Sequence, residues 1–128
     1  LRAWLRQSSL FYSPFQPPEV LFQENTQRDL EKTETYAAGL CLFHLLQKRY
    51  PLWTIYMRDE RLSRYTPIEK EKVLNLMRQS YEKTLRTIGE YGKQKQLMVI
   101  ILGLLHPDPE QRMTLKEAAH QVEVLSKS

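Results

Sequence analysis

The chain has 128 residues, with 19 basic and 15 acidic side chains spread along it and a net charge of +4. This length suits one domain with its own core, and the lack of a dense Lys/Arg stripe argues against a nucleic-acid interface. The single cysteine, Cys41, excludes an internal disulfide, and no Cys/His spacing indicates zinc, so we expect a cytoplasmic protein without a metal site. The longest apolar run, 97–105, is too short to span a bilayer.

The first 27 residues are expected to form an irregular arm, because Pro14, Pro17 and Pro18 interrupt any periodic pattern. From residue 28 to residue 128 the hydrophobic periodicity is helical, and no stretch alternates with period two, so no strand is predicted. The stretch 34–49 is apolar on nearly every side, which is typical of a helix at the centre of a core. Pro51 follows it and is expected to end it.

Two capping-box patterns mark later helix starts. Thr66-Pro67-Ile68-Glu69 is the first, and an apolar stripe at spacings of three and four follows it until Gly89 and Gly92. Residues 95–105 predict a further apolar helix, which the turn 106–109 breaks, and Thr114-Leu115-Lys116-Glu117 starts the last helix. The sequence therefore predicts an all-α helical bundle behind an irregular N-terminal arm.

Four stretches in this order resemble the C-terminal lobe of the protein kinase fold, from the end of the activation segment to the last helix. They are Pro17-Pro18-Glu19, similar to an Ala-Pro-Glu motif; 34–46, similar to the central helix that opens with Asp-x-Trp/Tyr-Ser-x-Gly; 47–52, similar to a Gly-x-x-Pro-Phe ending; and 104–114, similar to Asp-Pro-x-x-Arg-x-Thr. The resemblance covers residues 11–125, although 53–92 match only loosely.

The resemblance implies roles for particular residues. Glu19 and Arg112 are expected to form a buried ion pair that anchors the arm, whereas without the motifs both would be solvated charges. Glu34 is expected to act as a core anchor, at a position where kinases carry Asp. Ser13, Phe15, Gln16 and Pro17 lie where a kinase contacts its substrate. Trp53, Tyr56 and Met57 follow Pro51, in a region that kinases use for docking, so they form a possible docking surface, although core packing is the favoured interpretation.

The catalytic parts of a kinase are missing from this sequence. It contains no G-x-G-x-x-G, no His-Arg-Asp and no Asp-Phe-Gly, and each of these would lie before Leu1. No residue is therefore predicted to be catalytic, and ATP and magnesium are expected only if an upstream part is an active kinase. Phe11 and Tyr12 replace the usual Gly-Thr, and Ala37 replaces Ser, which leaves both a pseudokinase and a divergent active kinase open.

Three functions remain open at this point. The first is the C-terminal part of a kinase-like domain that docks a protein substrate or a regulatory protein, possibly beside the remainder of the kinase domain. The second is a fragment of an active, divergent Ser/Thr kinase, which would act in the host cytosol if it is a secreted bacterial effector. The third is an independent helical interaction domain. None of these readings calls for nucleic acid or a membrane span.

Overall fold

A computed structural model describes residues 16–21, 30–59 and 61–127. Within these ranges the regular structure consists of α-helices and 3-10 helices, with no strand. The predicted all-α class is thus confirmed for this part of the chain. The predicted arm is described only over residues 16–21, so its boundary at residue 27 lies outside the described residues.

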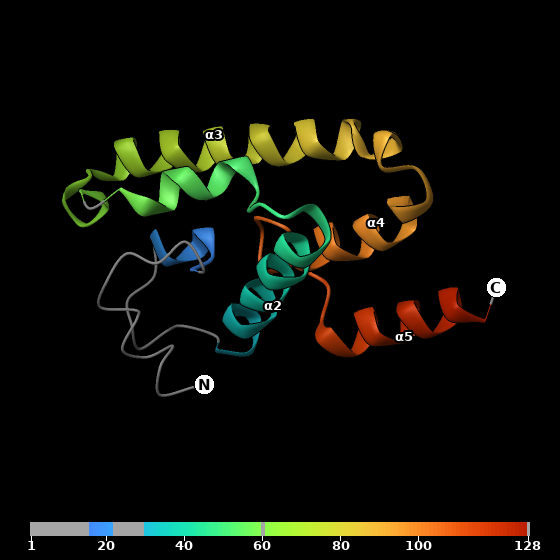
Figure 1. The fold of residues 1–128 in the computed structure, drawn as a ribbon. Coiled ribbons are helices and arrows are strands. Elements are labelled where there is room, and N and C mark those ends of the chain that lie inside the picture. Colours follow the sequence, from blue (N-terminus) through green and yellow to red (C-terminus); the bar gives the residue numbers. More distant parts are fainter. Residues whose placement is uncertain (1–15, 22–29, 60, 128) are drawn as a thin grey trace.

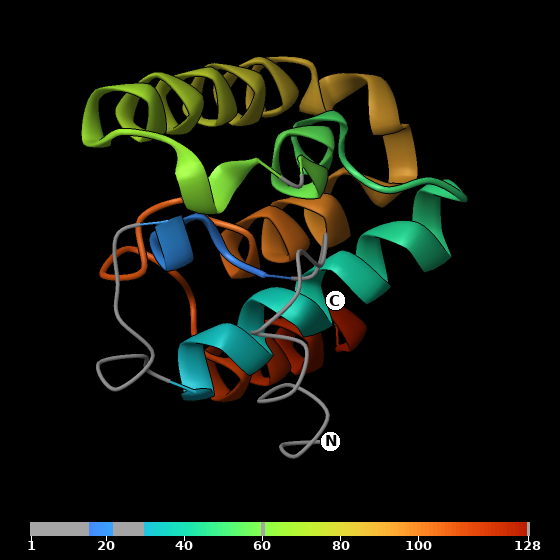
Figure 2. The same cartoon turned by 90° about the vertical axis from the view of Figure 1, so that its left-hand side faces the viewer.

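The helices follow one another with short connections. In chain order they are η1 (Pro18–Leu21), α2 (Leu30–Gln47), η3 (Leu52–Arg58), η4 (Leu62–Arg64), α3 (Pro67–Arg86), η5 (Ile88–Gln94), α4 (Lys95–Leu104) and α5 (Leu115–Ser126). Both views place α3 and α5 on opposite sides of the molecule, with α4 and α2 between them (Figures 1 and 2). The 3-10 segment η3 lies against α3, and α4 contacts both α2 and α5.

The two predicted capping patterns begin helices. Thr66 accepts a hydrogen bond from the Glu69 backbone N–H at 3.2 Å, and the Glu69 carboxylate accepts one from the Thr66 N–H at 3.1 Å. At the start of α5, Thr114 accepts from the Glu117 N–H at 3.1 Å. Each bond satisfies an N–H group that has no partner inside its helix, which explains why both helices start where the sequence predicts.

The main core gathers side chains from α2, η3, α3 and α4. Its most buried members are Tyr36, Leu40, Phe43, Trp53, Met77, Met98, Ile101, Leu102 and Leu105. A smaller cluster of Ile100, Leu104 and Ala118 joins α4 to α5. Gly39 lets α2 approach α4 closely, because a Cβ atom there would come within 2.8 Å of Leu105 Cδ2.

One expectation about α2 is wrong. The helix carries no charged residue from Thr35 to Gln47 and was expected to be buried on every side, but only one face meets the core. Leu45 is 66% exposed, and Cys41 and Leu42 are exposed beside it. Tyr36, Leu40 and Phe43 share the buried face at spacings of four and three. Apolar character thus predicted the helix, but not how many neighbours would cover it.

The C-terminal end of α2 has an uncommon backbone conformation. Lys48 has φ 62°, in the left-handed region that favours glycine, and its N–H donates to the His44 carbonyl at 2.7 Å. Helix α2 therefore ends at Gln47, before Pro51. Gly92 has φ 58° and kinks the connection between α3 and α4, so its glycine is required there.

Candidate functional site

Arg112 and Glu19, 93 residues apart in the sequence, are joined by hydrogen bonds between their side chains. Arg112 Nη1 donates to Glu19 Oε2 at 2.7 Å and Nη2 donates to Oε1 at 2.8 Å, so the two planar groups meet in a bidentate arrangement. The Arg112 side chain is 0% exposed and that of Glu19 is 10% exposed. The two side chains that the sequence paired thus lie together, and the pair is buried.

The Arg112 guanidinium is also held by backbone groups. Its Nε donates to the His106 carbonyl at 3.0 Å, and its Nη1 donates to the Lys32 carbonyl at 3.1 Å. Together with the two bonds to Glu19, four of the five guanidinium N–H groups have an acceptor. One side chain therefore connects η1, the start of α2 and the turn that precedes α5.

That turn is organised by its own short-range bonds. The backbone N–H of Arg112 donates to the Pro109 carbonyl at 3.3 Å, and that of Gln111 donates to the Asp108 carbonyl at 3.0 Å. The Asp108 carboxylate accepts from the Glu110 N–H at 2.9 Å. Asp and Pro favour tight turns of this kind. The turn fixes the backbone at Arg112 and thereby the direction in which its side chain points.

Two aromatic residues connect the ion pair to the main core. Arg112 Cζ lies 5.0 Å from the centroid of the Tyr36 ring, within the range of a cation–π contact. The Tyr36 hydroxyl accepts a hydrogen bond from Trp53 Nε1 at 2.9 Å. Burial raises the pKa of Tyr36 far above its usual value, so the hydroxyl is neutral at all physiological pH values. The ion pair is thereby joined to the main core.

The residues predicted to contact a substrate do not form an exposed surface. Gln16 and Pro17 are both buried, because the segment 16–21 packs its prolines and Leu21 against the helical body. Ser13 and Phe15 lie outside the described residues. Gln16 and Pro17 are therefore not exposed in this structure, and both help to fasten the segment.

Of the two interpretations of Trp53, Tyr56 and Met57, core packing describes the first and the last. Trp53 and Met57 are each only 2% exposed and belong to the main core, and Tyr56 is half-buried. The outward face of η3 is instead formed by Leu52, Ile55 and Arg58, all exposed. A 3-10 helix has three residues per turn, so these three share one side. The sequence contains this spacing, but a 3-10 helix after Pro51 was not foreseen.

Glu34, the predicted core anchor, is half-buried on α2 and so lies at the edge of the core. The neighbouring positions Thr35 and Tyr36 are buried instead. Thr35 donates its hydroxyl hydrogen to the Glu31 carbonyl at 2.8 Å, which is a bond within the helix. Thr33, on the other side of Glu34 in the chain, is buried as well, so Glu34 is more exposed than its neighbours on both sides.

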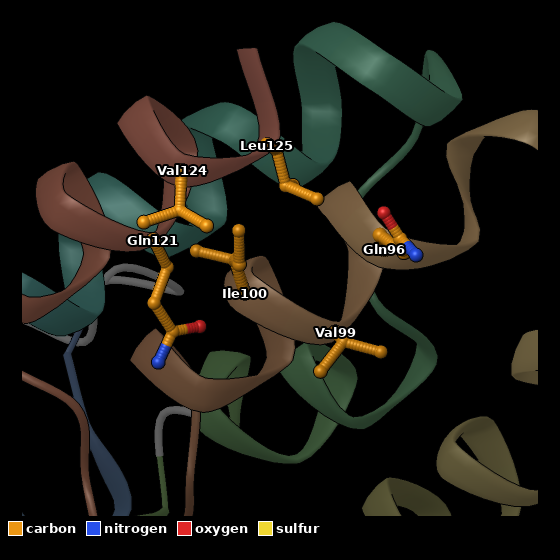
Figure 3. Close-up of a pocket in the computed structure, with 6 residues that line it drawn as sticks. All are labelled: Gln96, Val99, Ile100, Gln121, Val124 and Leu125. Carbon is orange, nitrogen blue, oxygen red and sulfur yellow. The ribbon is translucent and has the colours of Figure 1, made fainter. Parts of the chain in front are cut away.

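A groove that the sequence did not predict lies between α4 and α5. It has a volume of about 320 Å³ and is lined by Gln96, Val99, Ile100, Gln121, Val124 and Leu125 (Figure 3). Val99 and Val124 stand at its rim and are exposed, whereas Ile100 is buried at its base. The lining has no charged side chain. The sequence shows only that α4 and α5 carry apolar residues, which does not separate a groove from a closed interface.

Other kinds of site are not indicated by the described residues. Within 16–21, 30–59 and 61–127, no three His, Cys, Asp or Glu side chains come together in a way that could hold a metal ion. No helix in the same ranges has the length and apolar content to cross a membrane. Neither result bears on the rest of the chain.

Comparison with known proteins gives no relative. No family model matches this chain, and neither the curated proteins nor the solved structures contain a match to it.

Proposed function

We propose that this chain is the C-terminal part of a protein kinase-like domain, and that it docks a protein substrate or a regulatory protein without being catalytic alone. The observation that carries the proposal is the buried bidentate pair between Glu19 and Arg112. It joins the two motifs, 93 residues apart, on which the resemblance to a kinase C-terminal lobe chiefly rests. A chance occurrence of both motifs would not require them to meet in the interior.

The exposed face of α2 supports the view that the helices belong to a larger domain. The helix has no charge from Thr35 to Gln47, yet Leu42 and Leu45 face solvent. A helix that is apolar on every side is typical of the centre of a core. The remainder of a kinase-like domain would cover this face and remove the exposed leucines from water.

The surface proposed for docking is the outward face of η3, defined by Leu52, Ile55 and Arg58. Leu52 is 73% exposed and Ile55 is 66% exposed. The inner face of the same segment is fixed to the core by Trp53 and Met57, so the exposed side chains project from a rigid support. Arginine is enriched among the residues that contribute most to protein interfaces, and Arg58 lies beside these two exposed apolar side chains.

The test of the kinase assignment is the protein encoded by the whole reading frame. Intact Asp-x-x-x-x-Asn and Asp-Phe-Gly motifs upstream, with ATP and magnesium binding by calorimetry, would identify an active kinase. Degenerate motifs with weak or no nucleotide binding would identify a pseudokinase. Unrelated upstream sequence would overturn the proposal in favour of an independent helical interaction domain. The 128-residue chain alone is expected to show no ATP binding, and micromolar binding would contradict the proposal.

The docking surface is tested separately by photo-crosslinking in cells. A photoreactive residue at position 55 should yield one dominant protein adduct, and the substitution Leu52→Asp should abolish it. The matched control carries the photoreactive residue at Gln79, an exposed position on α3. Equal adducts from both positions would show that η3 is not the docking surface, while leaving the kinase assignment intact.

A further inference from the structure

The outward face of η3 lies in a basic stretch of the chain. Residues 48–64 include five basic and two acidic side chains, which gives this stretch a net charge of +3. Two exposed cations, Lys48 and Arg49, lie just before η3, and the exposed Arg58 is its last residue. The exposed apolar side chains of this face therefore have cations on both sides of them in the chain.

The cation on this face is not neutralised by a carboxylate. In the part of the chain that the structure describes, no ion pair includes Arg58. The neighbouring acid, Asp59, binds the Arg61 side chain at 3.1 Å and accepts from the Tyr65 hydroxyl at 2.6 Å, so its charge is offset by Arg61. The second acid of the stretch, Glu60, lies outside the described residues. Arg58 is thus an exposed arginine that can pair with the carboxylate of another molecule.

The spacing along η3 defines the shape of a partner that fits it. A 3-10 helix rises about 2.0 Å per residue, so Leu52, Ile55 and Arg58 follow one another at steps of about 6 Å. An α-helix rises about 1.5 Å per residue, so its side chains four positions apart are also about 6 Å apart along the axis. A partner helix with two apolar residues and one acidic residue at this spacing meets all three side chains at once.

Positive charge by itself does not distinguish η3 from the rest of the surface. One side of α3 also carries exposed cations, namely Arg78, Lys83 and Arg86. The side chains beside them are polar, and the acidic Glu82 stands among them. The face on η3 differs because it combines an unpaired arginine with apolar side chains that project into solvent. This combination suits an amphipathic partner.

We propose that the outward face of η3 binds an acidic amphipathic helix of a partner protein, with the residue order acidic-x-x-x-apolar-x-x-x-apolar-x-x-x-acidic. The two apolar residues cover Leu52 and Ile55, and one acidic residue pairs with Arg58 whichever way the helix runs. Complementary charge speeds association and selects the partner, whereas well-packed apolar contacts hold it. The inference rests on the docking surface proposed above and adds the chemistry of its partner.

Titration of the 128-residue chain with a helical peptide tests the proposal. The probe has the order Glu-x-x-x-Leu-x-x-x-Leu-x-x-x-Glu, with alanine and glutamine at the remaining positions, and the matched probe has lysine in place of both glutamates. NMR shift changes should centre on residues 52–58, and the acidic probe should bind about ten-fold more tightly than the lysine probe. Sodium chloride at about 0.5 M should weaken the acidic probe about five-fold. Equal affinities, no shift changes, or changes centred elsewhere overturn the proposal.

Exchange of one charge on the protein gives the sharper result. Arg58→Glu should weaken the acidic probe about ten-fold and make the lysine probe the tighter ligand, an exchange of preference that loss of folding does not produce. Arg78→Glu, on the basic side of α3, is the matched control and should leave both affinities unchanged. Equal effects of the two variants overturn the proposal. If Arg58→Glu does not fold, Arg58→Gln replaces it and should abolish the difference between the probes.

Failure of this inference is distinguishable from failure of the docking surface. If the photoreactive residue at position 55 gives its dominant adduct in cells but the two probes bind equally, the docking surface stands and the acidic partner is wrong. If position 55 gives no adduct, the docking surface is wrong and this inference falls with it.

An anionic membrane is the competing class of partner. Vesicles of phosphatidylcholine and phosphatidylserine should not retain the chain, because two apolar side chains bury little area in a bilayer. Co-sedimentation with these vesicles that Leu52→Asp abolishes, without binding of the acidic probe, would overturn the proposal in favour of a membrane surface.

Discussion

Two arginine–carboxylate pairs in this molecule have similar contact distances and opposite surroundings. Arg112 meets Glu19 at 2.7 Å in the interior, whereas Arg61 meets Asp59 at 3.1 Å with its side chain 73% exposed. The first pair joins segments 93 residues apart, and the second lies within one turn. The distance between charges thus says little by itself; burial and sequence separation decide what each pair does.

The exposed pair organises only its own turn. Asp59 accepts from the Arg61 backbone N–H at 2.9 Å and from the Tyr65 hydroxyl at 2.6 Å, in addition to the Arg61 side chain. The hydrogen bonds from Arg61, followed by the one from Tyr65, hold the pKa of Asp59 well below its usual range. Water would replace most of these bonds, so their contribution to folding is small. The buried pair has no such substitute.

The largest effect is expected from removing the buried arginine. Arg112→Ala leaves Glu19 and two backbone carbonyls without their donor in the interior, and should lower the free energy of unfolding by about 3–5 kcal/mol. Denaturant unfolding at pH 7 measures this. Lys116→Ala, at an exposed position of α5, is the control, and a loss for Arg112→Ala no larger than that of the control would contradict a buried pair.

A double-mutant cycle sharpens the comparison of the two pairs. Glu19→Ala, Arg112→Ala and their combination should give a coupling energy of about 2–3 kcal/mol, because the partners share one buried network. The same cycle on Asp59 and Arg61 should give about 0.2–1 kcal/mol. Equal coupling energies in the two cycles would show that burial does not distinguish the pairs.

Two tyrosine hydroxyls extend the comparison to alkaline pH. Burial raises the pKa of Tyr81 to about 12, so the folded chain keeps this proton while the unfolded chain loses it near pH 10. The stability that Tyr81 contributes is complete below pH 10 and is lost as the pH rises from 10 through 12. Tyr81→Phe should therefore flatten the decline of stability over this range.

At neutral pH the same substitution should cost about 1–3 kcal/mol, since the Leu102 carbonyl loses its buried donor. Tyr65→Phe is the control, because its hydroxyl serves the exposed turn. Thermal unfolding from pH 8 to pH 11.5 measures both effects. An alkaline decline that is identical in wild type and Tyr81→Phe would contradict the assignment.

The smallest effect is expected from the exposed arginine. Arg61→Ala should change the free energy of unfolding by no more than about 0.5 kcal/mol. It should nevertheless raise the pKa of Asp59, because the guanidinium bonds are the first cause of its lowering. Carboxyl NMR titration detects this shift. A raised pKa of Asp59 without a loss of stability would show that the Arg61–Asp59 interaction forms but does not stabilise the fold. A loss of stability as large as that of Arg112→Ala would show that the exposed pair stabilises the fold as much as the buried pair does.

Local signals in the sequence predicted the helix starts well. Thr66 and Thr114 cap α3 and α5 as expected, because a cap depends only on residues within one turn. The pairing of Glu19 with Arg112 could not be obtained from periodicity, since it joins distant segments. It came from the resemblance of two motifs, and the geometry agrees with it.

The predictions that failed concern which face of an element meets the core. Core packing, the favoured interpretation of Trp53 and Met57, is what the structure shows, but the 3-10 helix was not expected, and its three-residue period turns Leu52 and Ile55 outward. The exposed face of α2 and the groove beside Val124 were also not predicted, because an apolar pattern does not show which faces have neighbours. Hydrophobicity predicts that a side chain favours burial, but the number and position of neighbours decide whether it is buried.

The absence of a side chain at Gly39 affects residues that Gly39 does not itself contact. It sets the spacing between α2 and α4, since the Leu105 side chain already occupies the place where a methyl group would be. Tyr36, one turn earlier on α2, supports the guanidinium of Arg112, and His106, directly after Leu105, supplies one of its acceptors. The Arg112 guanidinium therefore has contacts with α2 and with the residue that follows the end of α4. Because Gly39 has only a hydrogen atom in place of a side chain, α2 and α4 pack closely enough to bring both contacts to Arg112.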